Sequence, residues 1–210
     1  DDQDFRKKAE EISQKNNNKI EIVCFDLEKE HEIEKAFQQI KMIFPKIDIL
    51  INNAGINQIS LFQMTTQKDL NKIFQVNVFS QVLFTQYILK LMTKNKNGGS
   101  IVFVSSTAAL DANQGRNAYA SSKAALISQS KVLSRELGTK NIRVNSIAPG
   151  ITDTEMLKKN TPENLVKKIK ESTSLSRIAR PEEIANVILF LSSDLSSYIT
   201  GQVIRADGGM

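Results

Sequence analysis

Residues 47–55 have the sequence IDILINNAG, in which a short apolar run passes directly into a polar turn that contains glycine. The run has the length and the β-branched content of a buried strand. Similar apolar runs occur at residues 20–25, 101–105 and 142–148, and residues 202–206 form the last one. The chain is therefore predicted to contain several short strands separated by longer connections.

The connections between these runs carry the periodicity of amphipathic helices. Residues 5–14 and 32–44 are predicted helices, residues 66–94 form a long one, and further helices cover residues 117–137 and 180–193. Short strands that alternate with helices form βαβ units, which give a parallel sheet covered on both faces. The predicted fold class is α/β, with a doubly wound parallel sheet.

The composition fits one α/β domain over residues 1–210. Hydrophobic residues make up 40% of the chain, and its longest apolar runs stay far below the roughly 20 residues of a membrane span. The lysines behind the net charge of +5 are dispersed, so no nucleic-acid partner is predicted. With no visible secretory signal and with one cysteine, Cys24, predicted to pack in the core, a cytoplasmic protein is expected. The one histidine, His31, lies among charged residues, and no metal site is predicted.

Polar or turn-forming residues stand at the ends of four predicted strands. Asp26, Asn52, Ser106 and Pro149 each follow an apolar run. In parallel sheets, ligands bind beyond the carboxyl ends of the strands, so these residues are expected to meet at one edge. The alternative is that strand ends simply need turns.

Tyr119 and Lys123 lie one helical turn apart in NAYASSKAALISQSK, residues 117–131. Side chains at positions i and i+4 share one face of a helix, so the phenol and the ammonium can enter one site. Free tyrosine has a pKa of about 10, and a nearby cation favours the phenolate. With Ser106 at the end of the preceding strand, three polar groups are predicted to converge. Taken singly, the tyrosine could also be a packing residue and the lysine a solvated charge.

Six motifs, in this order, resemble those of the short-chain dehydrogenase/reductase family. They are NNAG at residues 52–55, Asn77 in QVNVFS, Ser106, YASSK at residues 119–123, PG at residues 149–150 and DGG at residues 207–209. The resemblance extends over nearly the whole chain. It implies a Rossmann-like, three-layer α/β/α fold, a nicotinamide cofactor, and a catalytic tetrad of Asn77, Ser106, Tyr119 and Lys123.

The resemblance also implies a role for each member of this tetrad. Ser106 would hydrogen-bond the substrate oxygen, and Tyr119 would exchange a proton with it, while the cofactor carries the hydride. Lys123 would hold the nicotinamide ribose and lower the pKa of Tyr119. Asn77 would hold a water that links Lys123 to solvent.

Further residues are implied to contact the cofactor. Asp26 and Leu27 would flank the adenine, and the backbone of Asn53, Ala54 and Gly55 would pass beside the adenosine ribose and the phosphates. Gly55 fits that place because it has no side chain. Beyond the strand at residues 142–148, the implied contacts are Pro149, Gly150, Ile151, Thr152 and Thr154. Residues 154–173 match the substrate lid of the family.

The sequence lacks the glycine-rich turn, T-G-x-x-x-G-x-G, with which members of the family hold the pyrophosphate. Its first residues correspond to the region after the second strand of the family. Roughly 35 to 40 residues of that fold, with its N-terminal strands, are therefore expected to be absent from this chain. The ribose 2′ position is read at the end of the second strand, so the choice between NAD and NADP stays open, with NADP slightly favoured.

Two stretches resemble 3-oxoacyl-[acyl-carrier-protein] reductases within the family: residues 133–150 and 196–210. The implied reaction is the reduction of a 3-oxoacyl thioester, on a small molecule or on acyl carrier protein. A sugar, steroid or other secondary-alcohol dehydrogenase is an alternative, as is a non-catalytic nucleotide-binding protein.

A homodimer or homotetramer is also predicted, through the long helix at residues 66–94 and the helix that carries Tyr119. The long helix has apolar residues on more than one face, and one face is enough to cover the sheet. These residues include Phe79, Leu83, Phe84, Tyr87 and Leu91.

Overall fold

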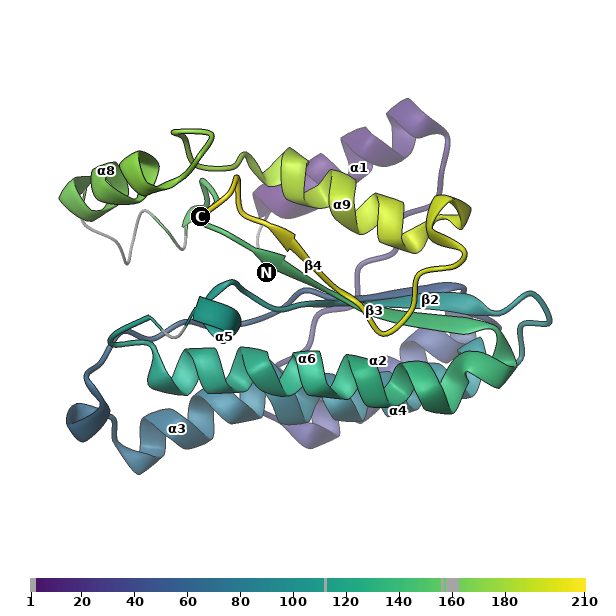
Figure 1. Cartoon of the computed structure of the whole chain (residues 1–210). Coiled ribbons are helices and arrows are strands. Elements are labelled where there is room, and N and C mark those ends of the chain that lie inside the picture. The colour runs from purple at the N-terminus through teal and green to yellow at the C-terminus, as the bar shows by residue number, and fades with distance from the viewer. Residues whose placement is uncertain (1–2, 112, 156, 158–162) are drawn as a thin grey trace.

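A parallel, four-stranded sheet forms the centre of the molecule (Figure 1). Its strands are β1 (Ile49–Asn52), β2 (Gly99–Val104), β3 (Ile142–Pro149) and β4 (Val203–Ala206), and they lie in the order β1-β2-β3-β4. Every neighbouring pair is parallel, as predicted. Among the described strands, β1 pairs with β2 alone.

The structure, a computed structural model, describes residues 3–111, 113–155, 157 and 163–210. Within these residues, no helix is both long enough and apolar enough to span a membrane.

Helices cover both faces of the sheet, which confirms the three-layer α/β/α architecture (Figure 1). Below the sheet in this view lie α2 (Glu30–Ile43), α3 (Gln67–Phe74), α4 (Ser80–Met92) and α6 (Asn117–Leu137). Above it lie α1 (Gln3–Asn16) and α9 (Pro181–Ser192). The remaining helices are α5 (Ala108–Asp111) and α8 (Glu163–Ser172).

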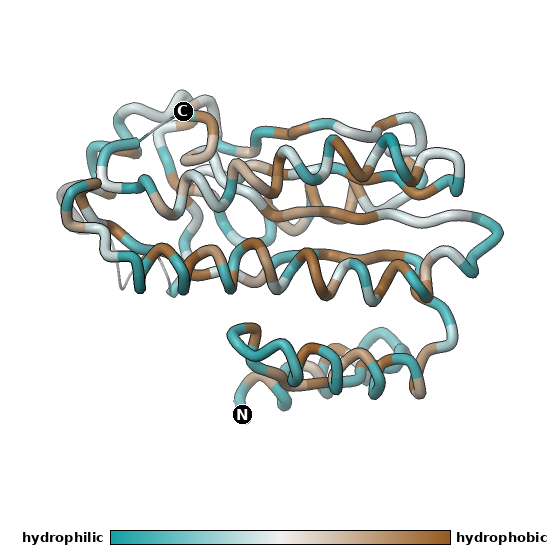
Figure 2. Tube along the Cα trace, turned by 90° about the horizontal axis from the view of Figure 1, so that it is seen from below, coloured by the Kyte–Doolittle hydropathy of each residue, from teal (hydrophilic) through white to brown (hydrophobic). Residues whose placement is uncertain are grey.

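The strands β2 and β3 are buried on both faces, and Ile101–Val104 of β2 is accordingly apolar without alternation. Ile101 and Phe103 of β2 belong to the larger hydrophobic cluster, which includes Leu126 of α6. Val102 and Val104 point the other way, into a smaller cluster with α9. Hydrophobic stretches accordingly run through the middle of the molecule in Figure 2. The sheet is thereby fixed between two layers of helices.

The long helix predicted at residues 66–94 is interrupted by a π-helical segment, Gln75–Phe79, between α3 and α4. Thr66 begins the helix with a capping box, in which its hydroxyl accepts from the Asp69 N–H and the Asp69 carboxylate accepts from the Thr66 N–H. A π-helical turn holds one more residue than an α-helical turn, and such turns are frequent at functional sites. Asn77 lies in the middle of this segment and is fully buried.

The strand predicted at residues 20–25 is not present, and that prediction was wrong. A strand needs a neighbour to pair its backbone groups, and none of the described strands pairs with this segment. Phe25 still stacks on Phe84, with 5.5 Å between ring centroids, so the segment is anchored by a side chain. Cys24, predicted to be core, is exposed.

Leu126 and Leu189 provide a matched test of this layering. Leu126 is 0% exposed between α6 and the sheet, whereas Leu189 on α9 is 67% exposed. We expect Leu126→Ala to lower the free energy of unfolding by about 2–5 kcal/mol, because it leaves a cavity in the core. Leu189→Ala should change it by less than about 0.5 kcal/mol. Urea denaturation measures both values, and equal losses would contradict the core position of Leu126.

Candidate active site

The carboxyl ends of the strands, α5, the beginning of α6 and α8 all lie at one end of the molecule (Figure 1). Asn52, the last residue of β1, is buried and donates through Nδ2 to Thr85 Oγ1 at 3.0 Å. The glycine-containing turn identified in the sequence, residues 53–55, follows directly after Asn52. The candidate site is built where this turn meets α6 and the π-helical segment.

Asn77 joins these three parts. Its Oδ1 accepts from the Ile56 N–H at 2.8 Å, and its Nδ2 donates to the Ile56 carbonyl and to Ser122 Oγ, both at 3.0 Å. The side chain thus ties the turn after β1 to α6. Its predicted role in holding a water is not tested by these contacts and stays a prediction.

Lys123 lies under this turn, with 4% of its surface exposed. Its Nζ donates to the Val104 carbonyl at 2.8 Å, while Ser105 Oγ donates to the carbonyl of Lys123 itself at 2.8 Å. The end of β2 therefore holds both the side chain and the backbone of Lys123. Burial lowers the pKa of the ammonium to about 8, so it is still mostly charged at neutral pH. An ammonium has three donors, and those not used here can serve a ligand hydroxyl.

Tyr119 lies above Lys123, whose Nζ is 5.9 Å from the centroid of the tyrosine ring. Burial raises the pKa of the phenol, whereas a hydrogen bond with Ser106 and the positive charge of Arg116 lower it. The predicted convergence of Ser106, Tyr119 and Lys123 is therefore seen in the structure.

The charge of Arg116 lowers the pKa of Tyr119, whereas the predicted effect of Lys123 on this pKa stays a prediction. The ammonium of Lys123 is directed at the Val104 carbonyl and lies under the ring. Sequence reasoning missed Arg116. Its position three residues before Tyr119 could have indicated the contact, because residues i and i+3 lie side by side where a helix begins.

The absence of a side chain at Gly55 is required by the protein itself. A Cβ atom there would lie 3.1 Å from Lys123 Nζ and 3.3 Å from Asn77 Oδ1. The neighbouring Asn53 and Ala54 are exposed, and the Ala54 carbonyl accepts from Gln81 Nε2 at 2.6 Å. The turn therefore leaves bare backbone beside the buried ammonium, as a close-fitting ligand requires.

Asp26 and Leu27 precede α2 and are far from the tetrad in sequence. Hydrogen bonds nevertheless connect this segment to the region of the tetrad. Leu27 offers its carbonyl to the hydroxyl of Ser80, which follows the π-helical segment. Asp26 accepts from the Glu28 N–H at 2.9 Å, and mainly this hydrogen bond lowers the pKa of its carboxyl group. Within the described part of the chain Asp26 makes no hydrogen bond to the tetrad, so its role at the adenine stays a prediction.

The residues after β3 are held by two neighbouring segments. Pro149 accepts from the Thr107 N–H at 3.0 Å, and a Cβ on Gly150 would lie 2.7 Å from Asp207 Cα. Ile151 accepts from the Ala179 N–H at 3.0 Å, and Thr152 forms a parallel bridge with Ala179.

Thr154 is exposed, and it begins the predicted lid at residues 154–173. Of that lid, the structure describes residues 154, 155, 157 and 163–173, while residues 156 and 158–162 lie outside the described part. Among these residues Gly55 lies against Lys123 and Asn77 of the tetrad, and the cofactor contacts of the others stay predictions.

Comparison with known proteins gives consistent matches. Residues 1–210 match a family model described as enoyl-(acyl carrier protein) reductase. The 3-oxoacyl-[acyl-carrier-protein] reductase FabG of Aquifex aeolicus is 42% identical over 202 residues, which are 96% of this chain and 81% of that protein. A 3alpha-hydroxysteroid dehydrogenase of Mediterraneibacter gnavus is 39% identical over 84% of this chain and 70% of its own length.

Among solved structures, a putative gluconate dehydrogenase from Agrobacterium tumefaciens superimposes with a TM-score of 0.92. It is 26% identical, and the match covers 100% of this chain and 83% of that one. The similarity therefore includes the whole described fold.

Gly55 and Gly138 form a matched pair for testing the packing around Lys123. We expect Gly55→Ala to lower the free energy of unfolding by about 1–3 kcal/mol, because its methyl group would press on Lys123 and Asn77. Gly138→Ala should leave stability unchanged or slightly raised, since a Cβ there meets nothing within 4 Å. Thermal and urea unfolding measure both, and a Gly55 variant as stable as the Gly138 variant would show that Lys123 is not confined.

Proposed function

Because the chain belongs to the short-chain dehydrogenase/reductase family and is an NAD(P)-dependent oxidoreductase, we propose that it reduces 3-oxoacyl thioesters, with acyl carrier protein as the carrier. The observation that supports a reaction at this site is the arrangement of Tyr119. Its phenol lies between the Ser106 hydroxyl and the Arg116 charge, above the buried ammonium of Lys123. Such an arrangement suits proton transfer to a carbonyl oxygen.

The residues of the site also fit a nicotinamide cofactor. The ammonium of Lys123 is buried, and among the described residues it donates to one carbonyl, so donors remain for ribose hydroxyls. Gly55 leaves bare backbone beside it. When bound, the cofactor supplies the hydride.

The chain's own side chains then have separate tasks in the proposed reaction. Ser106 donates to the substrate carbonyl oxygen and holds it beside Tyr119. The Tyr119 phenol gives this oxygen its proton, and burial keeps the phenol protonated at neutral pH by raising its pKa. Lys123 holds the ribose, and Asn77 keeps the turn after β1 in place.

We propose NADP ahead of NAD, because a net charge of +5 favours the cofactor with the additional phosphate. A single domain and a cytoplasmic location, with no nucleic-acid or membrane partner, stay predictions from the sequence.

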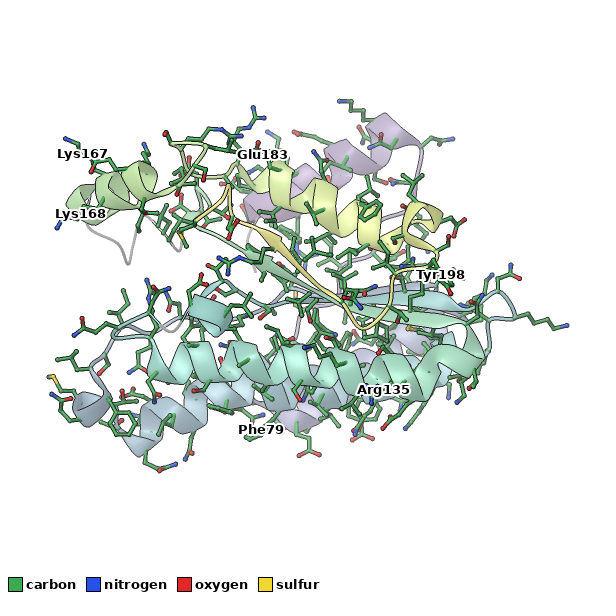
Figure 3. All side chains as sticks on the ribbon, in the orientation of Figure 1. Phe79, Arg135, Lys167, Lys168, Glu183 and Tyr198 are labelled. Atoms are coloured by element: carbon green, nitrogen blue, oxygen red, sulfur yellow. The ribbon has the colours of Figure 1, made fainter. Side chains whose placement is uncertain are left out.

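Tyr119→Phe tests the proton transfer. We expect it to lower kcat for an acetoacetyl thioester at least about 100-fold, with little change in stability or in NADPH affinity, because only the hydroxyl is removed. The control is Tyr198→Phe, since Tyr198 is fully exposed and lies at the opposite end of the molecule from the beginning of α6 (Figure 3). Steady-state kinetics decides, and a Tyr119 variant within a few-fold of the wild-type rate would end this assignment.

Some of the apolar residues named on the long helix are packed inside the protein, which leaves fewer of them for the predicted oligomer interface. Phe84 stacks on Phe25, and Tyr87 stacks on Phe37 with 4.9 Å between ring centroids. Leu91 is only 1% exposed. These three residues therefore lie on the packed part of the helix, where α2 and the segment before it cover them.

Two exposed apolar side chains nevertheless remain on the helical layer below the sheet. Phe79 is 56% exposed there (Figure 3), and Val132 on α6 is 52% exposed. We propose that these two residues lie in a homodimer or homotetramer interface.

Phe79→Lys tests the interface by placing a charge in it. We expect the dissociation constant of the oligomer to rise at least about 10-fold, measured by light scattering over a dilution series. Phe62→Lys is the control, because Phe62 is 75% exposed and lies outside both helices. A wild-type protein that is monomeric at micromolar concentration would refute the proposal.

A further inference from the structure

Arg116 is the residue immediately before α6, three positions from Tyr119. Its guanidinium is half-buried, and this burial lowers its pKa. The two side chains interact electrostatically: the charge of Arg116 lowers the pKa of Tyr119, and the phenol raises the pKa of Arg116. Their spacing of three residues at the beginning of α6 makes the two side chains neighbours.

The position of the guanidinium is fixed from across the site. Arg116 Nη1 donates to Asn57 Oδ1 at 2.7 Å, and the backbone beside it is joined by a hydrogen bond of 3.0 Å from the Ser60 N–H to the Gly115 carbonyl. Asn57 follows Ile56, which Asn77 holds through both of its backbone groups. The same turn thus meets both cations, because Gly55 lies against Lys123 and Asn57 accepts from Arg116.

The charge of Arg116 is not neutralised by the described part of the chain. There it makes no ion pair, and its guanidinium donates to a neutral amide, that of Asn57. Arg205, by contrast, lies between Asp111 at 2.7 Å and Asp207 at 2.6 Å. Arg143, also half-buried, donates to Leu191, Ser193 and Ser196.

A guanidinium has five N–H donors in a planar fork, so Arg116 has donors to spare. Partly buried charges are costly when they are unpaired, and an acceptor from a ligand would offset that cost. The acceptor that such a fork suits best is a planar acyl group with one or two oxygens.

We propose that Arg116 is a specificity-determining residue that binds an acyl oxygen located one methylene group from the reacting carbonyl, so that the site selects 3-oxoacyl compounds over simple ketones. This inference rests on the proposed function, because it assumes that the reacting oxygen lies between Ser106 and Tyr119. The reacting oxygen and the acyl oxygen of a 3-oxoacyl group are close enough to be held by neighbouring donors. Either a thioester carbonyl or a free carboxylate supplies this oxygen.

Arg116→Gln tests the proposal with three substrates: an acetoacetyl thioester of N-acetylcysteamine, free acetoacetate, and 2-hexanone, which lacks the second oxygen. At about pH 7 the phenol is protonated in every variant, since the pKa of Tyr119 is raised. We expect kcat/KM to fall at least about 10-fold for the thioester or for acetoacetate, and by less than about threefold for 2-hexanone. A larger loss with acetoacetate identifies a carboxylate as the ligand, and a larger loss with the thioester identifies its carbonyl.

Two variants control for indirect effects. Arg135→Gln removes an exposed arginine near the other end of α6 (Figure 3) and should change none of the three rates. Asn57→Asp leaves Arg116 in place but gives it a carboxylate partner, and it should reproduce the selective loss. Equal losses on all three substrates in Arg116→Gln, or no loss on any, would overturn the proposal.

Failure of the proposed reaction can be told apart from failure of this inference. If the wild-type protein reduces none of the 3-oxoacyl substrates, the proposed reaction fails. Calorimetric titration of acetoacetate into the protein with NADP⁺ then decides the role of Arg116, because no reduction is possible there. Binding at least about 10-fold weaker in Arg116→Gln supports the role, and equal or undetectable binding overturns it.

Discussion

The buried ammonium of Lys123 and its hydrogen bond to the Val104 carbonyl constrain everything around them. Removing a cation from water is costly, and the lowered pKa, about 8, reflects that cost. The position is maintained because Ser105 fixes the backbone of Lys123 to the end of β2. It also limits the neighbours, since any side chain at residue 55 would press on Nζ. A catalytic lysine here depends on correct packing of α6 against the sheet.

Asn77 extends this constraint to the turn after β1. An amide in a helix interior is locally unfavourable, and here its oxygen and nitrogen replace contacts that the turn at Ile56 cannot make within a strand or helix. The π-helical segment is the local cost of directing that amide inward. Such a departure from regular helix geometry is the kind that persists at a functional site, because the surrounding contacts hold it in place.

Much of this arrangement could be predicted from the sequence because it follows from local patterns. The strands β2 and β3 are recognisable as short, largely apolar runs, and the pairing of Tyr119 with Lys123 on one helix face depends on a spacing of four residues. The segment at residues 20–25 has the same apolar character, but a strand also requires a partner, and local sequence does not contain one. The contact between Arg116 and Asn57 joins positions 59 residues apart, so no periodic pattern could predict it.

Lys123 and Arg116, the two cations beside Tyr119, differ in how deeply they are buried. Lys123 is 4% exposed and lies under the ring, so its charge can be used only by a ligand that reaches below the phenol, past the bare backbone at Gly55. Arg116 is half-buried and held by Asn57, where a ligand arriving from solvent meets it first. A carbonyl group brought to Ser106 therefore lies between a deep cation suited to the cofactor and an outer cation suited to the rest of the substrate. Neither cation can accept the proton of the phenol, because a charged ammonium and a guanidinium have donors and no acceptor.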